Sequence, residues 1–389
     1  MKNGLNKGKD FFGHGIKILN YMDVNKNILN NENSIKGLVD VNAEEISRYN
    51  VNPNDLFFTR TSETSEEIGL SSAYMGKNID CVFSGFILRA RAKIKSINSL
   101  FYAYYFRNPM NRQKIIKHSS ITTRALISGS SLYSMKIKLT SLEEQEKIAE
   151  FLSSIDMKIT LLKEQLNHLN DFKKFCLQQL FAQKLRFKKE NGENYSEWKV
   201  CKVKDIFKER SEKGYEKLEL LSVTLGNGVQ KRAEIDAKDN SSDKRDKYKH
   251  VLPGDLVYNS MRMWQGASGV TEYEGIVSPA YTVLNPLNII NPLFYGYYFK
   301  TNEMIYKFKK YSQGLTSDTW NLKYPLISEI SIKNPSLKEQ NRIVNFLNLI
   351  DKKIQIQRNH IEEVKKFKKG LLQQMLISNP KLIIFFVEF

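Results

Sequence analysis

The sequence predicts an α+β fold in which two mixed α/β domains alternate with two long helices, as an internal repeat with pseudo-twofold symmetry. The first observation behind this prediction is a stretch that occurs twice, at residues 141–183 and 336–378. A shift of 195 residues superimposes Ser-Leu-x-Glu-Gln, Phe-Leu-x-x-Ile-Asp, Phe-Lys-Lys and Leu-Gln-Gln without a gap. The second observation is an apolar seam along each copy, and the third is a β-rich segment before each copy. A repeat of this length decides the architecture, because each copy folds as the same unit.

Each copy of the repeated stretch carries apolar residues spaced alternately three and four apart. A period of 3.5 residues held over this length predicts a coiled-coil helix rather than an ordinary amphipathic one. Ser141 and Ser336 each stand three residues before a Glu and are predicted to be N-caps. Because neither seam can be buried alone, we expect the two helices to pack on each other. The predicted seams are Ile148, Leu152, Ile155, Ile159, Leu162, Leu166, Leu169, Phe172, Cys176 and Leu180 in the first copy, and Ile343, Leu347, Ile350, Ile354, Ile361, Val364, Phe367, Leu371 and Met375 in the second, where Gln357 takes one polar place.

The globular segments are residues 1–140 and 198–335, with a polar linker at 184–197 and an apolar tail at 379–389. Short β-like runs separated by Gly, Pro and Asn turns predict strands in both segments. The segments also echo each other, since residues 52–56 resemble 252–256 and residues 100–106 resemble 293–299. The clearest predicted strands are 56–58, 81–83 and 86–88 in the first segment, and 256–258 and 280–283 in the second.

The chain has 60 Lys and Arg residues against 42 Asp and Glu, and this formal charge of +18 favours a polyanionic partner. The first repeated helix has a formal charge of −2 and the second one of +5, so about +15 of the total charge belongs to the globular segments and linkers. Three widely separated cysteines give neither a disulfide pattern nor metal-ligand spacing. No apolar run approaches the ~20 residues of a membrane span, and the tail is too short for one. Without a signal peptide, a cytoplasmic protein is expected.

The sequence contains no motif for catalysis. Residues 291–294 (Asn-Pro-Leu-Phe) resemble the Asn-Pro-Pro-Phe loop of adenine methyltransferases, but the second Pro is absent and residues 98–101 repeat the segment. The start of a strand or helix common to both domains is the better interpretation. The Gly13-x-Gly15 and Gly226-x-Gly228 pairs lack the context of a nucleotide-binding loop, and no Gly-x4-Gly-Lys-Ser/Thr motif exists. Since the five histidines are also scattered, we expect no catalytic site, no cofactor and no metal.

Several motifs give the chain a resemblance to a known family. The repeats carry Ser-Leu-x-Glu-Gln-x-x-Ile, Phe-Leu-x-x-Ile-Asp-x-x-Ile and Leu-Leu-Gln-Gln-Met. The globular segments add residues 254–258, 261–266 and 276–281 in the second and 55–62 in the first. Over nearly its whole length the chain resembles the specificity subunit of Type I restriction-modification systems.

This resemblance implies a non-catalytic subunit that binds double-stranded DNA. Each globular segment would be a target-recognition domain that reads one half of a bipartite site. The helices would form an antiparallel coiled coil that spaces the domains. They would also dock two adenine-N6 methyltransferase subunits, which carry the chemistry together with ATP-dependent restriction subunits. From the residues alone, the alternative is a structural adaptor whose basic domains bind RNA or a protein.

Polar loops beside the predicted strands hold the residues that we expect to contact DNA. A guanidinium in such a loop can bind guanine or phosphate, and a cluster of basic residues can follow a phosphate backbone. For Trp264 the alternative is a position in the core, and for Gln265 it is a hydrogen bond that braces the loop. For the charged residues the alternative is a solvated face. The candidate residues are Arg60, Thr61, Arg124, Lys231, Arg232, Lys244, Arg245, Arg262, Trp264 and Gln265.

The chain departs from the family pattern in two places. Residues 198–206 begin the second domain as the family usually does, whereas no counterpart precedes the first domain. The first domain is therefore expected to lack its opening strand. Thr140 stands where the second repeat has Pro335, so the start of the first helix is less sharply marked.

Overall fold

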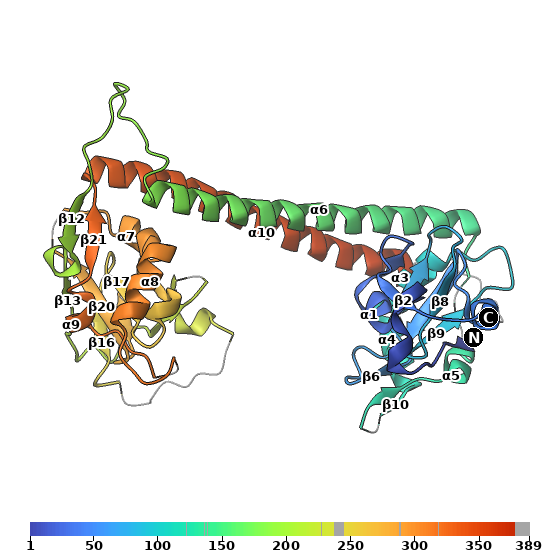
Figure 1. The fold of residues 1–389 in the computed structure, drawn as a ribbon. Coiled ribbons are helices and arrows are strands. Elements are labelled where there is room, and N and C mark those ends of the chain that lie inside the picture. Colours follow the sequence, from blue (N-terminus) through green and yellow to red (C-terminus); the bar gives the residue numbers. More distant parts are fainter. Residues whose placement is uncertain are drawn as a thin grey trace. The chain divides into compact units, whose positions relative to one another are not determined.

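The computed structural model describes residues 1–121, 123–135, 137, 139–226, 228–236, 245–287, 289–317 and 319–377. The candidate residue Lys244 and the apolar tail at 379–389 lie outside these ranges. The chain divides into two compact units, Met1–Glu164 with Asn359–Phe389 and Gln165–Arg358. Each unit contains one of the two globular segments and a part of each long helix (Figure 1).

A five-stranded sheet forms the centre of the first unit, in the order β1-β9-β5-β7-β3. Its neighbouring strands are antiparallel except for β3 and β7, which are parallel. Two three-stranded sheets accompany it, β4-β2-β8 and β10-β11-β6. The strands are β1 (Lys2–Asn3), β2 (Phe12–Leu19), β3 (Leu29–Asn30), β4 (Gly37–Val39), β5 (Asp55–Thr59), β6 (Thr61–Ser62), β7 (Ser71–Tyr74), β8 (Cys81–Phe83), β9 (Ile87–Ala90), β10 (Ser120–Ile121) and β11 (Ala125–Leu126).

Strand β5 is buried on both faces. Leu56 and Phe58 belong to a core that includes helix α3, whereas Phe57 packs with Val24 and Phe83 in a second core. The alternation follows from the two-residue period of a strand. The predicted strand at 56–58 is therefore the middle layer of the unit.

Helix α3 lies against the central sheet of the first unit and contacts β5 and β7 (Figure 1). Its N-cap is Asn98, whose side chain accepts a hydrogen bond from the Phe101 amide. Pro109 opens the next helix, at a position where its missing N–H removes no helical bond. The helices of this unit's globular segment are η1 (Lys9–Phe11), α1 (Tyr21–Lys26), α2 (Ala43–Tyr49), α3 (Ser99–Arg107), α4 (Pro109–Lys117) and α5 (Gly129–Tyr133).

A four-stranded antiparallel sheet, β13-β20-β17-β18, forms the centre of the second unit. Its strand β17 repeats the pattern of β5, with Leu256 and Tyr258 in one core and Val257 in another. The pairs β12-β21, β14-β15 and β16-β19 form separate two-stranded sheets. The strands are β12 (Lys199–Lys202), β13 (Phe207–Glu209), β14 (Leu221–Thr224), β15 (Gly228–Lys231), β16 (Lys249–Val251), β17 (Leu256–Asn259), β18 (Ser268–Val270), β19 (Gly275–Val277), β20 (Tyr281–Pro286) and β21 (Ser331–Asn334).

Helix α7 takes the place in the second unit that α3 takes in the first. Its N-cap is Asn291, which accepts a hydrogen bond from the Leu293 amide, and Pro292 stands in its first turn. The Asn-Pro-Leu-Phe segment is thus the start of a helix common to both units. The shorter helices here are η2 (Val203–Asp205), η3 (Arg232–Glu234), η4 (Met263–Gln265), α7 (Pro292–Tyr298), α8 (Asn302–Tyr311) and α9 (Tyr324–Ile327).

The repeated stretches form α6 (Leu142–Phe181) and α10 (Leu337–Ile377). The two helices pack together, as the sequence predicts. Both predicted N-caps are present, because the Ser141 and Ser336 hydroxyls accept hydrogen bonds from the Glu144 and Glu339 amides. The two glutamate side chains turn to other partners. No helix among the described residues is long and apolar enough to cross a membrane.

The helix seam differs from its predicted course at one position in each copy. Phe172 and Phe367 are 49% and 58% exposed. The inward place is taken one residue later, by Lys173 and Lys368, and this keeps the alternating spacing of three and four. At the polar place, Gln357 donates a hydrogen bond of 3.1 Å to Gln165. The eight seam positions Ile148, Leu152, Ile155, Ile159, Ile343, Leu347, Ile350 and Ile354 are buried.

The inward lysine of the first unit completes a small polar cluster. Lys368 Nζ lies 2.5 Å from Asp156 Oδ1, and the Tyr104 hydroxyl donates a hydrogen bond of 2.7 Å to Asp156 Oδ2. The ammonium also sits 5.1 Å from the centre of the Tyr104 ring. Burial, and then the Asp156 charge, raise the pKa of Tyr104, so its hydroxyl remains a donor. The cluster fastens α3 to the helix pair.

The second unit contains the same cluster at the repeat-related positions. Lys173 Nζ lies 2.5 Å from Asp351 Oδ1, and the Tyr297 hydroxyl donates a hydrogen bond of 2.6 Å to Asp351 Oδ2. Lys173 is 5.4 Å from the centre of the Tyr297 ring. In both clusters an early residue of one helix meets a late residue of the other, so the helices run antiparallel.

The glutamine of the Ser-Leu-x-Glu-Gln motif makes a second duplicated attachment. Gln145 Oε1 accepts a hydrogen bond of 2.8 Å from the Asn98 amide, at the start of α3. Gln340 Oε1 accepts one of 2.8 Å from the Asn291 amide, at the start of α7. Both glutamines are fully buried. The repeated motif therefore fixes each globular segment to its helix.

Candidate nucleic-acid interface

Three candidate residues of the first unit meet on the small sheet β10-β11-β6. Arg60 follows β5 directly, Thr61 is paired with Leu126 across β6 and β11, and Arg124 stands in the turn between β10 and β11. Arg124 is exposed, whereas Arg60 is half-buried, and its guanidinium lies 3.4 Å from the Gly85 carbonyl oxygen. The backbone of Arg60 is bonded on both sides, to Phe86 and Ile127. Arg60 and Arg124 thus stand directly before the two paired strands β6 and β11.

Arg112 braces the loop that follows β6. Its Nη2 group donates to the backbone carbonyls of Glu66 and Ile68. Burial lowers the pKa of Arg112 to about 10, which still leaves the guanidinium charged at neutral pH. The loop carries exposed carboxylates at Glu63 and Glu66. Carboxylates repel phosphate but accept hydrogen bonds from the cytosine amino group, so this loop suits base edges better than backbone.

Basic residues at the end of α4 were missed by the sequence analysis. Lys114 and Lys117 are exposed in its last turn, shortly before β10. The signal that could have found them is the spacing of basic residues at 112, 114 and 117, shortly before the polar loop of Arg124. They add exposed positive charge to the first unit, which can follow a phosphate backbone.

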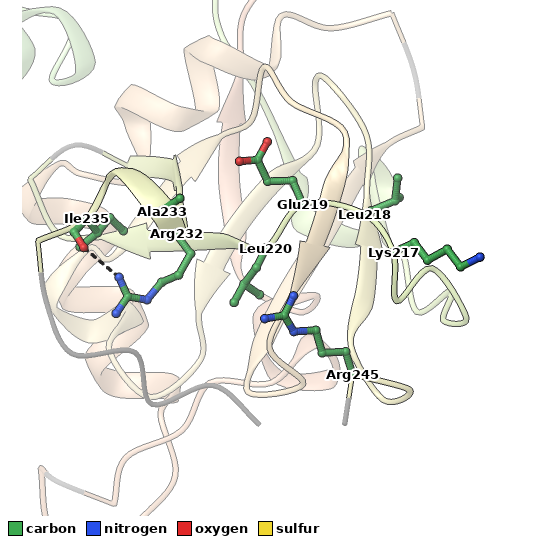
Figure 2. A pocket seen from close by; sticks show the side chains of 8 residues that line it. All are labelled: Lys217, Leu218, Glu219, Leu220, Arg232, Ala233, Ile235 and Arg245. Carbon is green, nitrogen blue, oxygen red and sulfur yellow. Dashed lines mark hydrogen bonds between the residues drawn. The ribbon is translucent and has the colours of Figure 1, made fainter. Parts of the chain in front are cut away.

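In the second unit, three basic residues line a pocket of about 560 Å³ together with Glu219 (Figure 2). Arg232 follows β15, and its guanidinium donates a hydrogen bond of 3.0 Å to the Ile235 carbonyl, marked by the dashed line in Figure 2. In the same view the Arg245 guanidinium is turned toward Leu220, while Lys217 extends away from the other labelled side chains. Lys217 was not predicted, because nothing in its local sequence sets it apart.

Lys231, one of the three described members of the predicted basic cluster, is already engaged. Its ammonium lies 3.0 Å from the Glu219 carboxylate and 5.3 Å from the centre of the Tyr273 ring. The bond to Glu219 raises the pKa of Lys231. A neutralised lysine attracts phosphate less than a free one, so Lys231 is a weaker candidate than its charge alone suggests.

The other candidates of the second unit lie on the η4 turn, directly after β17. Arg262 and Gln265 are exposed, and Met263 between them is fully buried and anchors the turn. Gly266 ends the turn with a φ of 85°. This left-handed conformation favours glycine, whereas a Cβ there would meet only the movable tip of the Ile305 side chain, at 2.9 Å.

Trp264 is a half-buried part of an aromatic pair. Its indole Nε1 donates a hydrogen bond of 3.1 Å to the Met261 carbonyl. Its ring packs edge to face on the Trp320 ring, with 5.3 Å between the ring centres. Lys309 of α8 lies 5.5 Å from the centre of the Trp320 ring. Trp320 and Lys309 were missed. A tryptophan within the polar run at 312–321 was the available signal.

Two glycines hold the β14-β15 hairpin against β18, the strand that follows η4. A Cβ on Gly269 would lie 2.8 Å from the Cα of Gly228. Because the two backbones are in direct contact here, the β14-β15 hairpin is held in a fixed position against β18. The two basic groups of the second unit therefore belong to one rigid framework.

Equivalent turns precede both central strands. Asn54 and Gly254 adopt φ values of 67° and 92°, and the next residues, Asp55 and Asp255, are buried. Each carboxylate accepts a hydrogen bond from the backbone amide three residues earlier. Arginine partners complete both sites, from different elements: Arg91 in the first unit and Arg210 in the second.

His250 is a buried titratable residue of the second unit with structural partners. His250 is buried, stacks on Tyr215 at 3.9 Å, and lies 3.0 Å from Glu274. The Tyr215 contact ties β16 to the loop before β14, and the Glu274 contact ties it to the turn before β19. Within the described part of the chain, no three His, Cys, Asp or Glu residues gather in a way that could hold a metal ion.

Comparisons with known proteins agree on one family. Residues 13–171 and 195–366 match the Type I restriction modification DNA specificity domain. The Type I restriction enzyme MjaVIII specificity subunit of Methanocaldococcus jannaschii is 24% identical over 363 residues, which are 85% of this chain and 80% of that protein. The MjaX specificity subunit of the same organism is 30% identical over 173 residues, 42% of this chain, and the match spans only 40% of that subunit.

Solved structures share the fold. The S subunit of a Type I restriction-modification system from M. genitalium gives a TM-score of 0.55 at 15% identity, covering 97% of this chain and 93% of that one. A chain from a structure of type I R-M complex assembly and conformational transition also gives 0.55, at 13% identity, with 93% and 91% covered.

Proposed function

Because the chain belongs to the Type I restriction modification DNA specificity family, we propose that its two units each read one half of a bipartite site on double-stranded DNA. Subunits of this family recognise DNA and are not themselves catalytic. In the first unit the reading face would be the β10-β11-β6 sheet with Arg60, Thr61 and Arg124. In the second it would be the η4 turn and the neighbouring basic pocket.

The observation that carries this proposal is the duplicated attachment of each globular segment to the helix pair. Tyr104 with Asp156 in the first unit corresponds to Tyr297 with Asp351 in the second. The same attachment supports the view that both segments present equivalent faces, although their reading loops differ. Two domains that recognise different DNA sequences need the same attachment to the helices but different loops facing the bases.

We further propose that the helix pair sets the gap between the two half-sites. Uninterrupted helices of 40 and 41 residues support this role, since they are stiff over a length of about 60 Å at 1.5 Å per residue. Inward lysines paired with aspartates fix a single antiparallel register, because a buried unpaired charge is costly.

The helices also carry features that suit a partner present in two copies, which we propose to be the adenine-N6 methyltransferase subunit, with ATP-dependent restriction subunits joining the complex. Leu161 and Ile356 occupy the same repeat position and are 53% and 67% exposed. Phe172 and Phe367, also repeat-related, lie eleven residues further along each helix, about three turns, and so share a face with them. Exposed apolar residues at repeated positions suit one kind of partner bound twice.

The proposal is tested by co-expressing the chain with a Type I methyltransferase subunit in a host that lacks adenine methylation. Single-molecule sequencing would then map N6-methyladenine across the genome. We expect one motif made of two short sequences separated by a fixed gap, and none when the chain is omitted. A continuous motif would contradict the two-reader proposal. A stable complex that binds RNA but leaves DNA unmodified would favour the adaptor alternative.

A further inference from the structure

Each unit carries a hairpin at the same place in its fold. In the first unit the hairpin is β10-β11, after α4, and in the second it spans 313–321, after α8. The residues that follow the hairpins, Ile127 and Leu322, are buried and stand 195 positions apart. Their amides donate hydrogen bonds to the carbonyls of Arg60 and Ser260, which directly follow the central strands β5 and β17. The two hairpins are therefore equivalent.

The hairpin of the second unit holds a large apolar side chain in water. Leu315 is fully exposed. Gly314, before it, has a φ of 146°, and a Cβ there would lie 2.6 Å from the Thr319 carbonyl oxygen. Thr316, after it, donates a hydrogen bond of 3.1 Å from its amide to the Thr319 hydroxyl, and its carbonyl accepts one from the Trp320 amide. Leu315 thus stands between two residues whose backbones are held.

The hairpin of the first unit also exposes an aliphatic side chain. Ile121 pairs with Ala125 across the hairpin and is 59% exposed, and the exposed Arg124 directly precedes Ala125. A single exposed aliphatic residue on a protein surface needs no explanation. Here, however, two equivalent hairpins of different sequence each present one. The shared feature is the exposed aliphatic side chain rather than a particular residue.

Lysines precede both hairpins. Lys114 and Lys117 stand in the last turn of α4, Lys309 and Lys310 stand in the last turn of α8, and all four are exposed. Lys309 also lies 5.5 Å from the centre of the Trp320 ring, inside the second hairpin. Lysine is depleted in protein–protein interfaces, whereas phosphates flank every base step of a duplex. Because a two-stranded hairpin also fits a DNA groove, the combination favours double-stranded DNA as the occupant.

We propose that Leu315 and Ile121 are apolar wedges, each of which presses between neighbouring base pairs of the half-site that its own unit reads. An aliphatic side chain inserted at a base step partly unstacks it, and the burial of apolar surface offsets part of that cost. The wedge forms no hydrogen bond with a base edge, so it senses how easily a step deforms. This inference rests on the proposed DNA recognition and adds local deformation of the duplex to it.

Fluorescence of 2-aminopurine tests the wedges in the complex with methyltransferase subunits. The duplex contains the motif found by methylome mapping, with one purine at a time replaced on either strand. The methylated adenine is left in place, because methyltransferases themselves flip their target base. The wild-type complex should raise the fluorescence severalfold at one step of each half-site, since lost stacking relieves quenching.

The variants assign each signal to one hairpin. Leu315→Ala should abolish the rise in one half-site only, and Ile121→Ala should abolish it in the other. Leu315→Met keeps an apolar wedge and should retain the rise. The matched control is Ile289→Ala, which removes an 89% exposed aliphatic side chain from the second unit outside the hairpin and should change neither signal. The thermal unfolding midpoint of each variant checks that the fold is intact.

An unchanged rise in Leu315→Ala, or no rise in the wild type, would overturn the proposal. Loss of methyltransferase subunits from Leu315→Ala in gel filtration would assign the hairpin to a protein contact and overturn it as well. In methylome mapping, Leu315→Ala should keep the wild-type motif with less methylation at each site. A wild-type complex that yields no bipartite motif would instead contradict the proposed function, on which the wedges rest.

Discussion

Lys173 Nζ and Asp351 Oδ1 lie 2.5 Å apart, and a shift by one repeat turns this pair into the Asp156–Lys368 pair of the first unit. In each pair the second carboxylate oxygen accepts a hydrogen bond from a tyrosine of the globular segment. One aspartate thus joins three elements: its own helix, the opposite helix and the domain. This gives a structural reason for the repetition of the Phe-Leu-x-x-Ile-Asp and Phe-Lys-Lys motifs.

Replacing either aspartate should loosen only its own unit. Asp351→Ala leaves the half-buried Lys173 without its carboxylate and removes one of the two acceptors of the Tyr297 hydroxyl, the other being Asn348 Oδ1. We expect a loss of about 1–3 kcal/mol in the free energy of unfolding of the second unit. Asp156→Ala should do the same to the first. The control is Glu143→Ala, which breaks an exposed pair with Lys147 and should cost less than about 1 kcal/mol. Hydrogen exchange resolved by unit measures all three, and equal losses in both units from one substitution would contradict this role.

The attachment of β12 should weaken in acid. Lys202 and Lys204 both bind Glu329, and these bonds lower the pKa of Glu329 from 4.5 to about 2. Because the folded pKa is the lower one, the stabilisation is present above pH 4.5 and is lost as the pH falls toward about 2. Glu329→Gln should remove that part of the pH dependence. The measurement is the urea midpoint of the second unit, followed by Trp198 fluorescence in a Trp264→Phe, Trp320→Phe background. An identical acid response in wild type and variant would show that Glu329 plays no part.

Two basic residues of the second unit should differ in their effect on DNA binding. Arg262→Ala removes an exposed guanidinium from the η4 turn, and we expect a loss of about 1–3 kcal/mol in affinity with relaxed selectivity at one position of one half-site. Lys231→Ala should cost much less, because Glu219 already neutralises that ammonium. Competition binding by the complex with methyltransferase subunits, at one fixed salt concentration, measures both. A larger loss from Lys231→Ala than from Arg262→Ala would reverse the assignment.

The sequence predicted the helices to within two residues at each end, because a repeat and a seam constrain every turn. It wrongly placed Phe172 and Phe367 in the seam, because it chose the apolar residue over the lysine that follows it. In the structure the inward residues are Lys173 and Lys368, whose charges are neutralised by aspartates of the opposite helix. It could not find Arg112, whose partners are backbone carbonyls of a loop more than 40 residues away. Lys231 was named but its neutralisation by Glu219 depends on strand pairing, which a local motif does not reveal.

Lengthening the helix pair should widen the gap between half-sites. Four residues inserted into both helices, after Gln165 and after Gln357, add ~6 Å, which is at most ~2 base pairs of duplex. Such a stutter locally unwinds a coiled coil without breaking it. The same insertion into α6 alone should instead destabilise the chain, because one of the two lysine–aspartate pairs would lose its register. Methylome mapping reads the gap, and an active double insertion with the original gap would mean that other parts set the distance.

Exchange of residues 198–335 for the corresponding segment of another family member tests the two-reader claim most directly. The donor segment should keep a tyrosine at the place of Tyr297, so that the attachment to Asp351 survives. Methylated adenines are then mapped genome-wide with the same methyltransferase subunit. The account predicts that one half of the motif changes while the other half and the gap stay as they were. A change in both halves together would contradict it.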